Sequence, residues 1–291
     1  MRKTTFAICF WGLMALGLPA QDLKVSNIWL FQTAQGAGGW TLTNPQFLTG
    51  FNAQGYNNQP FFADDDRLWI TVQHGDQTDI HELNLVQKTH TPLVETLGTS
   101  EYSAGTTPDG QALSVVRVET DGAQRLWAFP LDGGSPEPLF PHIKGVGYYA
   151  WLPDGAAALF IVGADEASHT LVLAKPAPAP TERVSAHIGR CLRTSPDGKV
   201  VFVHKATEQT WFLKTYEPAS KRFQILGVMP GGVEDFVLLP DGGFLCAEGS
   251  RLLLLTPDQT WKPVADVASY GILHVSRMAI NGQGKLALVA D

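Results

Sequence analysis

The chain has 291 residues and a formal net charge of −7; 17% of its residues are charged and 44% are hydrophobic. This composition provides enough apolar side chains for a buried core, and it excludes both an intrinsically disordered chain and a long coiled coil. The acidic balance and the lack of a basic run argue against nucleic acid as a partner.

The first twenty residues are typical of a secretory signal peptide. Arg2 and Lys3 precede an uncharged, mostly apolar run over residues 4–18, and a small residue, Ala20, stands before polar Gln21. These features mark a signal peptide, and the run is shorter than the ~20 residues that a membrane span needs. We expect cleavage after Ala20 and export to the periplasm or medium of a bacterium. The mature chain, residues 21–291, would then have no transmembrane segment.

Turns containing Pro-Asp-Gly recur at an even spacing along the chain. Four complete copies are Thr107–Gly110, Leu152–Gly155, Ser195–Gly198 and Leu239–Gly242, and two degenerate copies are Asp64–Asp66 and Asn281–Gly284. Their markers stand at positions 65, 109, 154, 197, 241 and 283, so the intervals are 42–45 residues. Proline fixes φ, aspartate can bond its own backbone and glycine supplies a positive φ, so each copy predicts a tight reversal.

The residues between the turns have the pattern of short strands. An apolar stretch such as Val200–Val203 follows each turn, and a second amphipathic stretch such as Arg125–Leu131 comes later in the unit. Four strands in about 44 residues are the blade of a β-propeller. The sequence therefore predicts an all-β fold in which residues 21–291 form a single six-bladed β-propeller domain.

The two ends of the chain complement each other. After the last turn only residues 285–291 remain, enough for one strand, whereas Asn27–Phe31 and Trp40–Leu48 precede the first turn. We expect these N-terminal strands to close the last blade, which would remove an exposed sheet edge.

The repeat, together with Gly55–Pro60, Ser114–Glu119, Arg125–Trp127 and Pro130–Gly134, resembles the TolB-like family of bacterial β-propellers. The resemblance extends from Ser26 to Asp291 and points to a branch of stand-alone secreted propellers. It implies the propeller architecture and an envelope location. The named member of the family is a periplasmic component of the Tol–Pal system and binds a lipoprotein at its propeller. We expect no counterpart of the extra N-terminal α/β domain of that protein, because only about seven residues separate the expected cleavage site from the first strand. The resemblance therefore does not extend to a Tol–Pal role.

The inner strand of a propeller blade lines the central channel, and in this chain it directly precedes each turn. Polar or aromatic residues stand six to eight positions before most markers, and His274 lies on the approach to the sixth inner strand. Convergent polar groups in a concavity predict a binding site. The candidates at one level of the channel mouth are Asn58, Gln59, Glu101, Tyr102, Tyr148, Arg190, Glu234, Asp235, His274 and Arg277. Alternatively, these residues only hydrate the entrance and pair with each other, as Arg190 could with Glu234.

Motifs for metal binding and catalysis are absent from the sequence. The aspartates of the turns lie in different blades and are explained by turn chemistry. The eight histidines do not form a ligand pattern, and there is no Gly-x-Ser-x-Gly sequence. Cys191 and Cys246 occur in apolar strand-like runs, which favours two buried thiols over a disulfide. We expect no catalytic residues, no metal site and no cofactor.

Three functions are consistent with these features. The favoured one is a monomeric, non-enzymatic module that binds a protein or another envelope component. The second is a metal-assisted enzyme of the lactonase or polysaccharide lyase type, with the acids of the funnel and His274 around the metal. The third is a glycan or small-ligand receptor in which Tyr102, Tyr148 and Tyr149 supply stacking surfaces. Propellers host many functions, so the fold does not choose among them.

Overall fold

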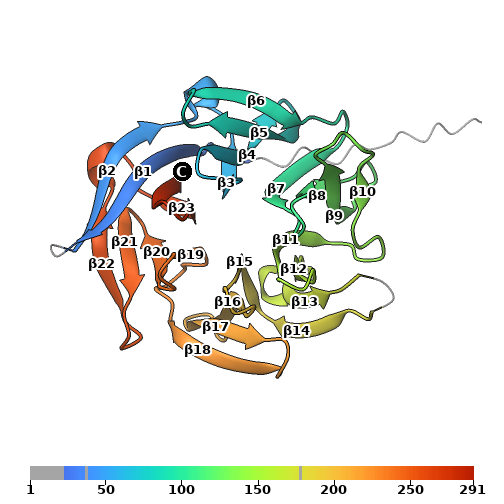
Figure 1. Cartoon of the computed structure of the whole chain (residues 1–291). Coiled ribbons are helices and arrows are strands. Elements are labelled where there is room, and N and C mark those ends of the chain that lie inside the picture. Colours follow the sequence, from blue (N-terminus) through green and yellow to red (C-terminus); the bar gives the residue numbers. More distant parts are fainter. Residues whose placement is uncertain (1–22, 37–38, 177–178) are drawn as a thin grey trace, which may run out of the picture.

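The computed structural model describes residues 23–291, apart from 37–38 and 177–178, as six four-stranded antiparallel sheets around a central axis (Figure 1). This arrangement confirms the predicted all-β, six-bladed β-propeller. The expected signal peptide, residues 1–20, lies outside the described residues. Among those described, no helix is long and apolar enough to cross a membrane.

Blades are numbered here in chain order, and their strands are given from the innermost to the outermost. Blades one to three contain β3 (Asn57–Phe62), β4 (Arg67–His74), β5 (Gln77–Asn84) and β6 (Thr89–Val94); β7 (Ser100–Thr106), β8 (Ala112–Val118), β9 (Gln124–Pro130) and β10 (Glu137–Pro138); and β11 (Val146–Trp151), β12 (Ala157–Ile161), β13 (Thr170–Ala174) and β14 (Glu182–Ala186). Blades four to six contain β15 (Ile188–Thr194), β16 (Val200–Lys205), β17 (Trp211–Glu217) and β18 (Arg222–Val228); β19 (Phe236–Leu238), β20 (Phe244–Glu248), β21 (Arg251–Leu255) and β22 (Trp261–Asp266); and β23 (Val275–Ile280), β24 (Lys285–Ala290), β1 (Asn27–Gly36) and β2 (Gly39–Phe47). Short 3-10 helices η1 (Gly50–Asn52), η2 (Glu166–Ser168) and η3 (Ala268–Tyr270) lie in the loops.

The ring closes where the two ends of the chain meet. β1 pairs antiparallel with β24, from Asn27 opposite Ala290 to Gln32 opposite Lys285. Blade six therefore takes its two inner strands from the C-terminal end and its two outer strands from the N-terminal end, as the sequence predicts. The pairing satisfies backbone groups that would otherwise form an open sheet edge.

Five of the six turns that define the repeat contain glycine and share one geometry. Each glycine N–H donates to the carbonyl three residues earlier at 2.8–3.1 Å. The φ angles lie between 69° and 87° for Gly110, Gly155, Gly198, Gly242 and Gly284. The carboxylates of Asp109, Asp154 and Asp241 each accept a bond at 3.0–3.1 Å from the backbone N–H two residues later. The aspartates thus stabilise the turns, as predicted.

The second strand of a blade is buried on both faces. In β16, Val200 and Phe202 pack toward blade three, whereas Val201 and Val203 pack toward blade five. Successive side chains of a strand point to opposite faces, so a strand buried on both faces needs a continuous apolar run. The apolar stretch after each turn is therefore the sequence mark of a strand that contacts two neighbouring blades.

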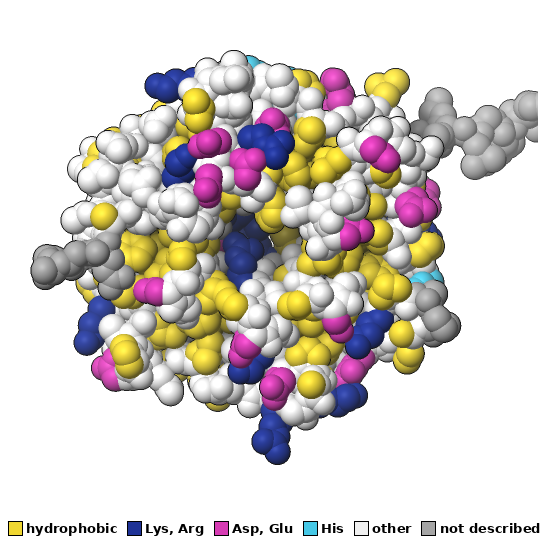
Figure 2. Space-filling model, in the orientation of Figure 1, with side chains coloured by type: hydrophobic (Ala, Val, Ile, Leu, Met, Phe, Trp, Pro, Cys, Tyr) yellow, Lys and Arg dark blue, Asp and Glu magenta, His cyan; other side chains and the backbone are white. Residues whose placement is uncertain are grey.

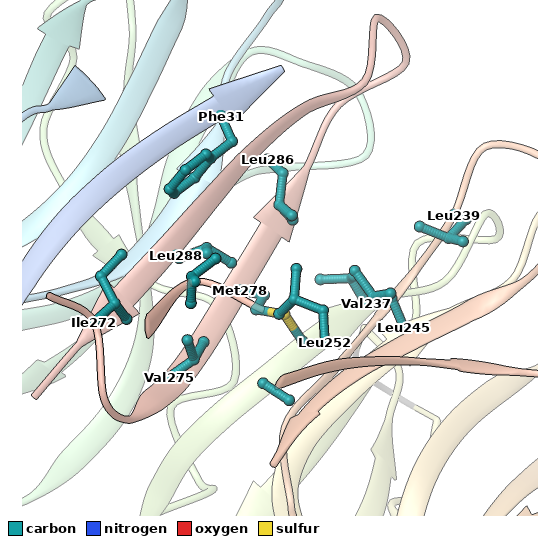
Figure 3. Close-up of a cluster of buried hydrophobic side chains, with 12 residues drawn as sticks. Phe31, Val237, Leu239, Leu245, Leu252, Ile272, Val275, Met278, Leu286 and Leu288 are labelled. Atoms are coloured by element: carbon teal, nitrogen blue, oxygen red, sulfur yellow. The ribbon is translucent and has the colours of Figure 1, made fainter. Parts of the chain in front are cut away.

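Hydrophobic clusters join each blade to the next. The described residues form six such clusters, one at each junction around the ring. Figure 3 shows the junction of blades five and six, whose cluster includes Phe31 of β1, Leu252 of β21 and Met278 of β23. Because the clusters continue around the ring, each blade depends on both of its neighbours.

Cys191 and Cys246 lie in one of these clusters, between blades four and five, and neither forms a disulfide. Burial raises the pKa of the Cys191 thiol to about 12, so the thiol stays protonated at neutral pH. The prediction of two buried thiols is confirmed.

Gly110→Ala tests the turn geometry. Gly110 has a φ of +69°, and no atom lies within 4 Å of the position that a Cβ would take, so the variant adds backbone strain without a clash. We expect the free energy of unfolding to fall by about 1–2 kcal/mol in urea denaturation.

Gly231→Ala is the matched control, because its Cβ also meets open space but its φ lies outside the left-handed range. It should change the free energy of unfolding by less than ~0.5 kcal/mol. Equal losses in the two variants would contradict the assigned turn.

Candidate functional site

The six inner strands enclose a channel that contains one cavity toward each face of the ring. The turn-side cavity, nearer the Pro-Asp-Gly turns, has a volume of about 530 Å³ and is lined by all six inner strands. The start-side cavity, where these strands begin, also measures about 530 Å³. Both are lined by Arg190, Asp235, Arg277 and Met278. These four residues form the waist of the channel.

The turn-side cavity has an aromatic wall that the neighbouring blade holds in place. The Tyr149 hydroxyl donates to the Ser114 carbonyl at 2.7 Å, and the Trp151 indole N–H donates to Ser114 Oγ at 3.0 Å. The ring of Tyr149 requires the small Gly105, where a Cβ would lie 2.9 Å from the hydroxyl oxygen. The aromatic residues of this wall are Phe61, Phe62, Tyr148, Tyr149 and Trp151.

Basic side chains lie at the floor of this cavity. Figure 2 shows a Lys/Arg patch at the bottom of the central opening, with apolar surface around it. The charged lining residues are Arg190, Arg193, Arg277 and the single acid Asp235. Their balance is positive, opposite in sign to the net charge of the chain.

Arg277 crosses the channel from blade six to blade three. Its guanidinium donates to the Tyr148 hydroxyl at 2.5 Å and lies 4.6 Å from the centroid of the Tyr148 ring. Burial lowers the pKa of Arg277, but Tyr148 and Asp235 raise it by more, so its pKa lies above the ordinary value. The guanidinium is therefore charged at any physiological pH and links two opposite blades.

Side chains from blades four and five satisfy the backbone of β23. Arg190 donates to the Ser276 carbonyl at 3.1 Å, and Arg193 donates to the Met278 carbonyl at 3.2 Å. The Asp235 carboxylate accepts from the Met278 N–H at 3.1 Å. An innermost strand has no partner strand on its channel side, so these side chains replace the missing ladder bonds.

Glu234 lies on the start side of the waist. Its carboxylate accepts from the backbone N–H of Arg190 at 3.0 Å, and Lys205 Nζ lies 3.0 Å from its other oxygen. Burial raises the pKa of Glu234, but the Arg190 N–H and Lys205 lower it by more, so its pKa falls below the ordinary value. Arg190 and Glu234 thus meet through the backbone of Arg190, and Lys205 balances the charge of Glu234.

The candidates from the sequence do not lie at one level of the channel. The turn-side cavity is lined by Gln59 and Tyr148, the start-side cavity by Asn58, Glu234 and His274, and both by Arg190, Asp235 and Arg277. Glu101 and Tyr102 line neither cavity. The structure therefore brings eight of the ten residues to the channel and separates them by depth.

Bulges in the inner strands explain this difference in depth. The register with the second strand shifts in β3, β7, β11, β15 and β23. Gln59 and Ser103, at two of these shifts, have a φ of 54°, which is typical of some bulge residues. Because a bulge adds a residue to one strand, a fixed count back from the turn reaches different depths in different blades.

Glu101 is buried within blade two and Tyr102 packs between blades two and three, which corrects their expected position in the channel. The Glu101 carboxylate is fully buried, accepts from the Thr99 hydroxyl at 2.9 Å and lies 3.2 Å from Arg117 Nε. Burial raises the pKa of Glu101 to about 7, although Thr99 and Arg117 oppose this shift. Tyr102 packs into the cluster between blades two and three. Strand side chains point to the two faces of the sheet, and in a blade these faces meet other blades.

Two further residues contribute to the site although they lie outside the window of six to eight positions before a marker. Arg193 stands four positions before Asp197, and Tyr56 stands nine before Asp65. Burial raises the pKa of Tyr56 well above its ordinary value, and Arg277 lowers it by less. The presence of Arg190 and Arg193 in one inner strand was the available sequence signal for the basic floor.

The described residues contain no group of three or more His, Cys, Asp or Glu side chains that could hold a metal ion. His274 Nδ1 lies 3.5 Å from the carboxylate of Asp291, and the His274 side chain is 57% exposed. His274 thus lies at the open end of the start-side cavity.

Solved structures share this fold, whereas no protein-family model and no curated protein matches the chain. A TolB-type protein from Agrobacterium tumefaciens has a TM-score of 0.67 and 15% identity, over 91% of this chain and 97% of its own. TolB from Acinetobacter baumannii has a TM-score of 0.58 and 15% identity, over 93% of this chain and 65% of its own. The oligogalacturonate lyase from Vibrio parahaemolyticus has a TM-score of 0.51 and 12% identity, over 91% and 97%. The chain therefore has the fold of TolB-type propellers, a fold that enzymes also use.

Tyr148→Phe tests the link across the channel. The variant removes the hydroxyl that accepts from Arg277 and keeps the ring beneath the guanidinium. We expect the free energy of unfolding to fall by about 1 kcal/mol, because the guanidinium loses one hydrogen bond near channel water. Tyr270→Phe is the control, since no hydrogen bond joins the Tyr270 hydroxyl to the described residues, and it should be near neutral. A Tyr148→Phe variant as stable as Tyr270→Phe would show that the link contributes nothing.

Glu101→Gln tests the burial of the carboxylate through pH. The pKa of Glu101 is higher in the folded chain, about 7, than its ordinary value near 4.5, so the folded state binds the proton more tightly. The native protein should therefore lose stability relative to the variant from about pH 5 to about pH 8, by on the order of 1–3 kcal/mol. Chemical denaturation at both pH values measures this difference. Exposed Glu137, changed to Gln in the same blade, is the control. If the native protein instead gained stability relative to the variant between pH 5 and pH 8, the ion pair with Arg117 would stabilise the carboxylate by more than burial destabilises it.

Proposed function

We propose that this protein is an exported, non-enzymatic propeller that binds a protein or another cell-envelope component at its turn-side cavity. The cavity carries this proposal: it measures about 530 Å³, all six blades contribute to it, and aromatic side chains line it around a few charged groups. Largely apolar cavities of ~300–1,000 Å³ with a few placed polar groups are typical ligand sites. We further infer that the chain acts as a monomer, in the periplasm or medium, without a resident cofactor.

The cavity is held in shape before any ligand arrives. Gln59 Oε1 accepts from the Ser103 N–H at 2.9 Å and from the Thr71 hydroxyl at 2.7 Å, so it ties blade one to blade two. At the next junction, Ser114 of blade two fixes Tyr149 and Trp151 of blade three. A preformed surface lowers the entropy that binding must lose, which favours a recognition role for this cavity.

Two alternatives remain from the sequence. The likeness to the Vibrio lyase favours an enzyme of the polysaccharide lyase type, but the floor of the turn-side cavity offers Asp235 and three arginines rather than a set of metal ligands. A glycan receptor would use Tyr148, Tyr149 and Trp151 as stacking surfaces. Of the three tyrosines considered from the sequence, Tyr102 lies outside the cavity, which leaves a smaller aromatic surface for that role.

Photocrosslinking in the producing cells tests the proposal. A benzophenone amino acid in place of Phe62, which lines the turn-side cavity, should give a discrete adduct with one envelope component. The same replacement at Phe223, which is 49% exposed on the outer strand β18, should not. The purified component should bind the native chain and bind Phe62→Ser about tenfold more weakly, whereas Phe223→Ser should match the native protein.

The proposal would be overturned by equal adducts at both positions, or by no adduct at Phe62 together with turnover of acidic oligosaccharides or lactones. The intact mass of the exported chain reports the expected cleavage after Ala20 in the same preparation.

A further inference from the structure

We propose that the waist and Arg193 form a binding site for the carboxylate group of a ligand that enters through the turn-side cavity. This inference rests on the proposed function and names the chemistry of its ligand.

The charged residues at the floor of the turn-side cavity favour an anionic ligand. Three guanidiniums, from Arg190, Arg193 and Arg277, line the floor of the turn-side cavity beside one carboxylate, Asp235. The other nearby acid, Glu234, is paired with Lys205 at 3.0 Å. Positive charge thus remains where the two cavities adjoin. In a protein with a net charge of −7, such a local surplus marks the place where an anion is attracted.

The guanidiniums at the waist have N–H donors that are not used within the described residues. A guanidinium has five N–H donors, and toward the described residues Arg277 donates only to Tyr148 while the Arg190 guanidinium donates only to Ser276. Arg190 Nε is buried without a partner among these residues, as are the hydroxyls of Ser103, Thr194 and Ser276. Buried polar groups are nearly always paired in native proteins. Arg190 and Arg277 both line the turn-side cavity and keep N–H donors for a ligand oxygen.

The shape of the site favours a carboxylate. The planar guanidinium matches the two oxygens of a carboxylate in a bidentate arrangement. Asp235 is 8% exposed and reduces the surplus charge, which suits a monoanion better than a phosphate dianion. Above the floor, Phe61, Tyr148 and Trp151 offer apolar contact to a flat ligand body. The best simple probe is therefore an aromatic carboxylate.

A purely structural role is the competing explanation. Arg190 and Arg193 bind carbonyls of β23, and Arg277 binds Tyr148, so all three could serve only to hold the blades together. Such a role predicts loss of stability on substitution and no preference for an anion. The two explanations therefore predict different results in a binding measurement, even where they predict the same loss of stability.

Isothermal titration calorimetry of the mature chain with benzoate, benzamide and phenyl phosphate tests the proposal. Benzoate and benzamide have nearly the same shape and differ in charge, so the native protein should bind benzoate about tenfold more tightly or better. Equal binding, or no binding of benzoate up to about 10 mM, would overturn the proposal. Phenyl phosphate bound tenfold more tightly than benzoate would overturn the choice of carboxylate. This comparison needs no variant.

The variant Arg190→Gln tests whether the preference for benzoate arises at the waist. It should reduce the preference for benzoate over benzamide to less than about threefold, whereas Arg222→Gln, at an exposed position on the outer strand β18, should leave it unchanged. Thermal unfolding without ligand shows whether each variant is folded. A folded Arg190→Gln that keeps the full preference would refute the site.

The outcomes separate this inference from the proposed function. If benzoate shows no preference while the adduct at Phe62 persists, the cavity binds its partner without a carboxylate site. If both experiments fail, the turn-side cavity is not a binding site.

Discussion

β1 and β24 come from opposite ends of the chain, and their pairing closes the ring of six blades. Closure allows every blade to pack against two neighbours, because a hydrophobic cluster lies at each junction, including the one between blades six and one. It also arranges the six inner strands around one axis and so creates the channel. Without this pairing, β24 would present an open edge and the clusters beside blade six would lose one side.

The strands that line the channel need hydrogen-bond partners for their backbone groups. The innermost strand of a blade has no neighbouring strand on the axis, so its backbone groups need other partners. At β23, Arg190, Arg193 and Asp235 supply them. This solution brings cationic side chains to the centre of an acidic protein. The basic floor of the turn-side cavity therefore follows from the need to satisfy a strand edge, and an anion site can use donors that this task leaves free.

The candidate site was partly predictable. Counting back from each turn identified the inner strands and found seven residues that line the channel, and His274, just before the sixth inner strand, is an eighth. The same count failed at Glu101, whose carboxylate pairs with Arg117 inside blade two, and at Tyr102, which packs toward blade three. It also missed Arg193 and Tyr56. The direction of a side chain and its depth in the channel depend on the bulge in its inner strand. A single sequence carries no clear mark of a bulge.

The sequence by itself determined the repeat, the number of blades and the way the ring closes. These features rest on local chemistry: positive φ at Gly110 and its equivalents, aspartates that bond their own turns, and apolar runs that suit strands buried on both faces. Tertiary structure alone decided which side chains meet at the waist. Arg190, Asp235 and Arg277 come from three blades more than 40 residues apart in sequence. Their meeting depends on closure of the ring and on the depth that each bulged strand reaches in the channel.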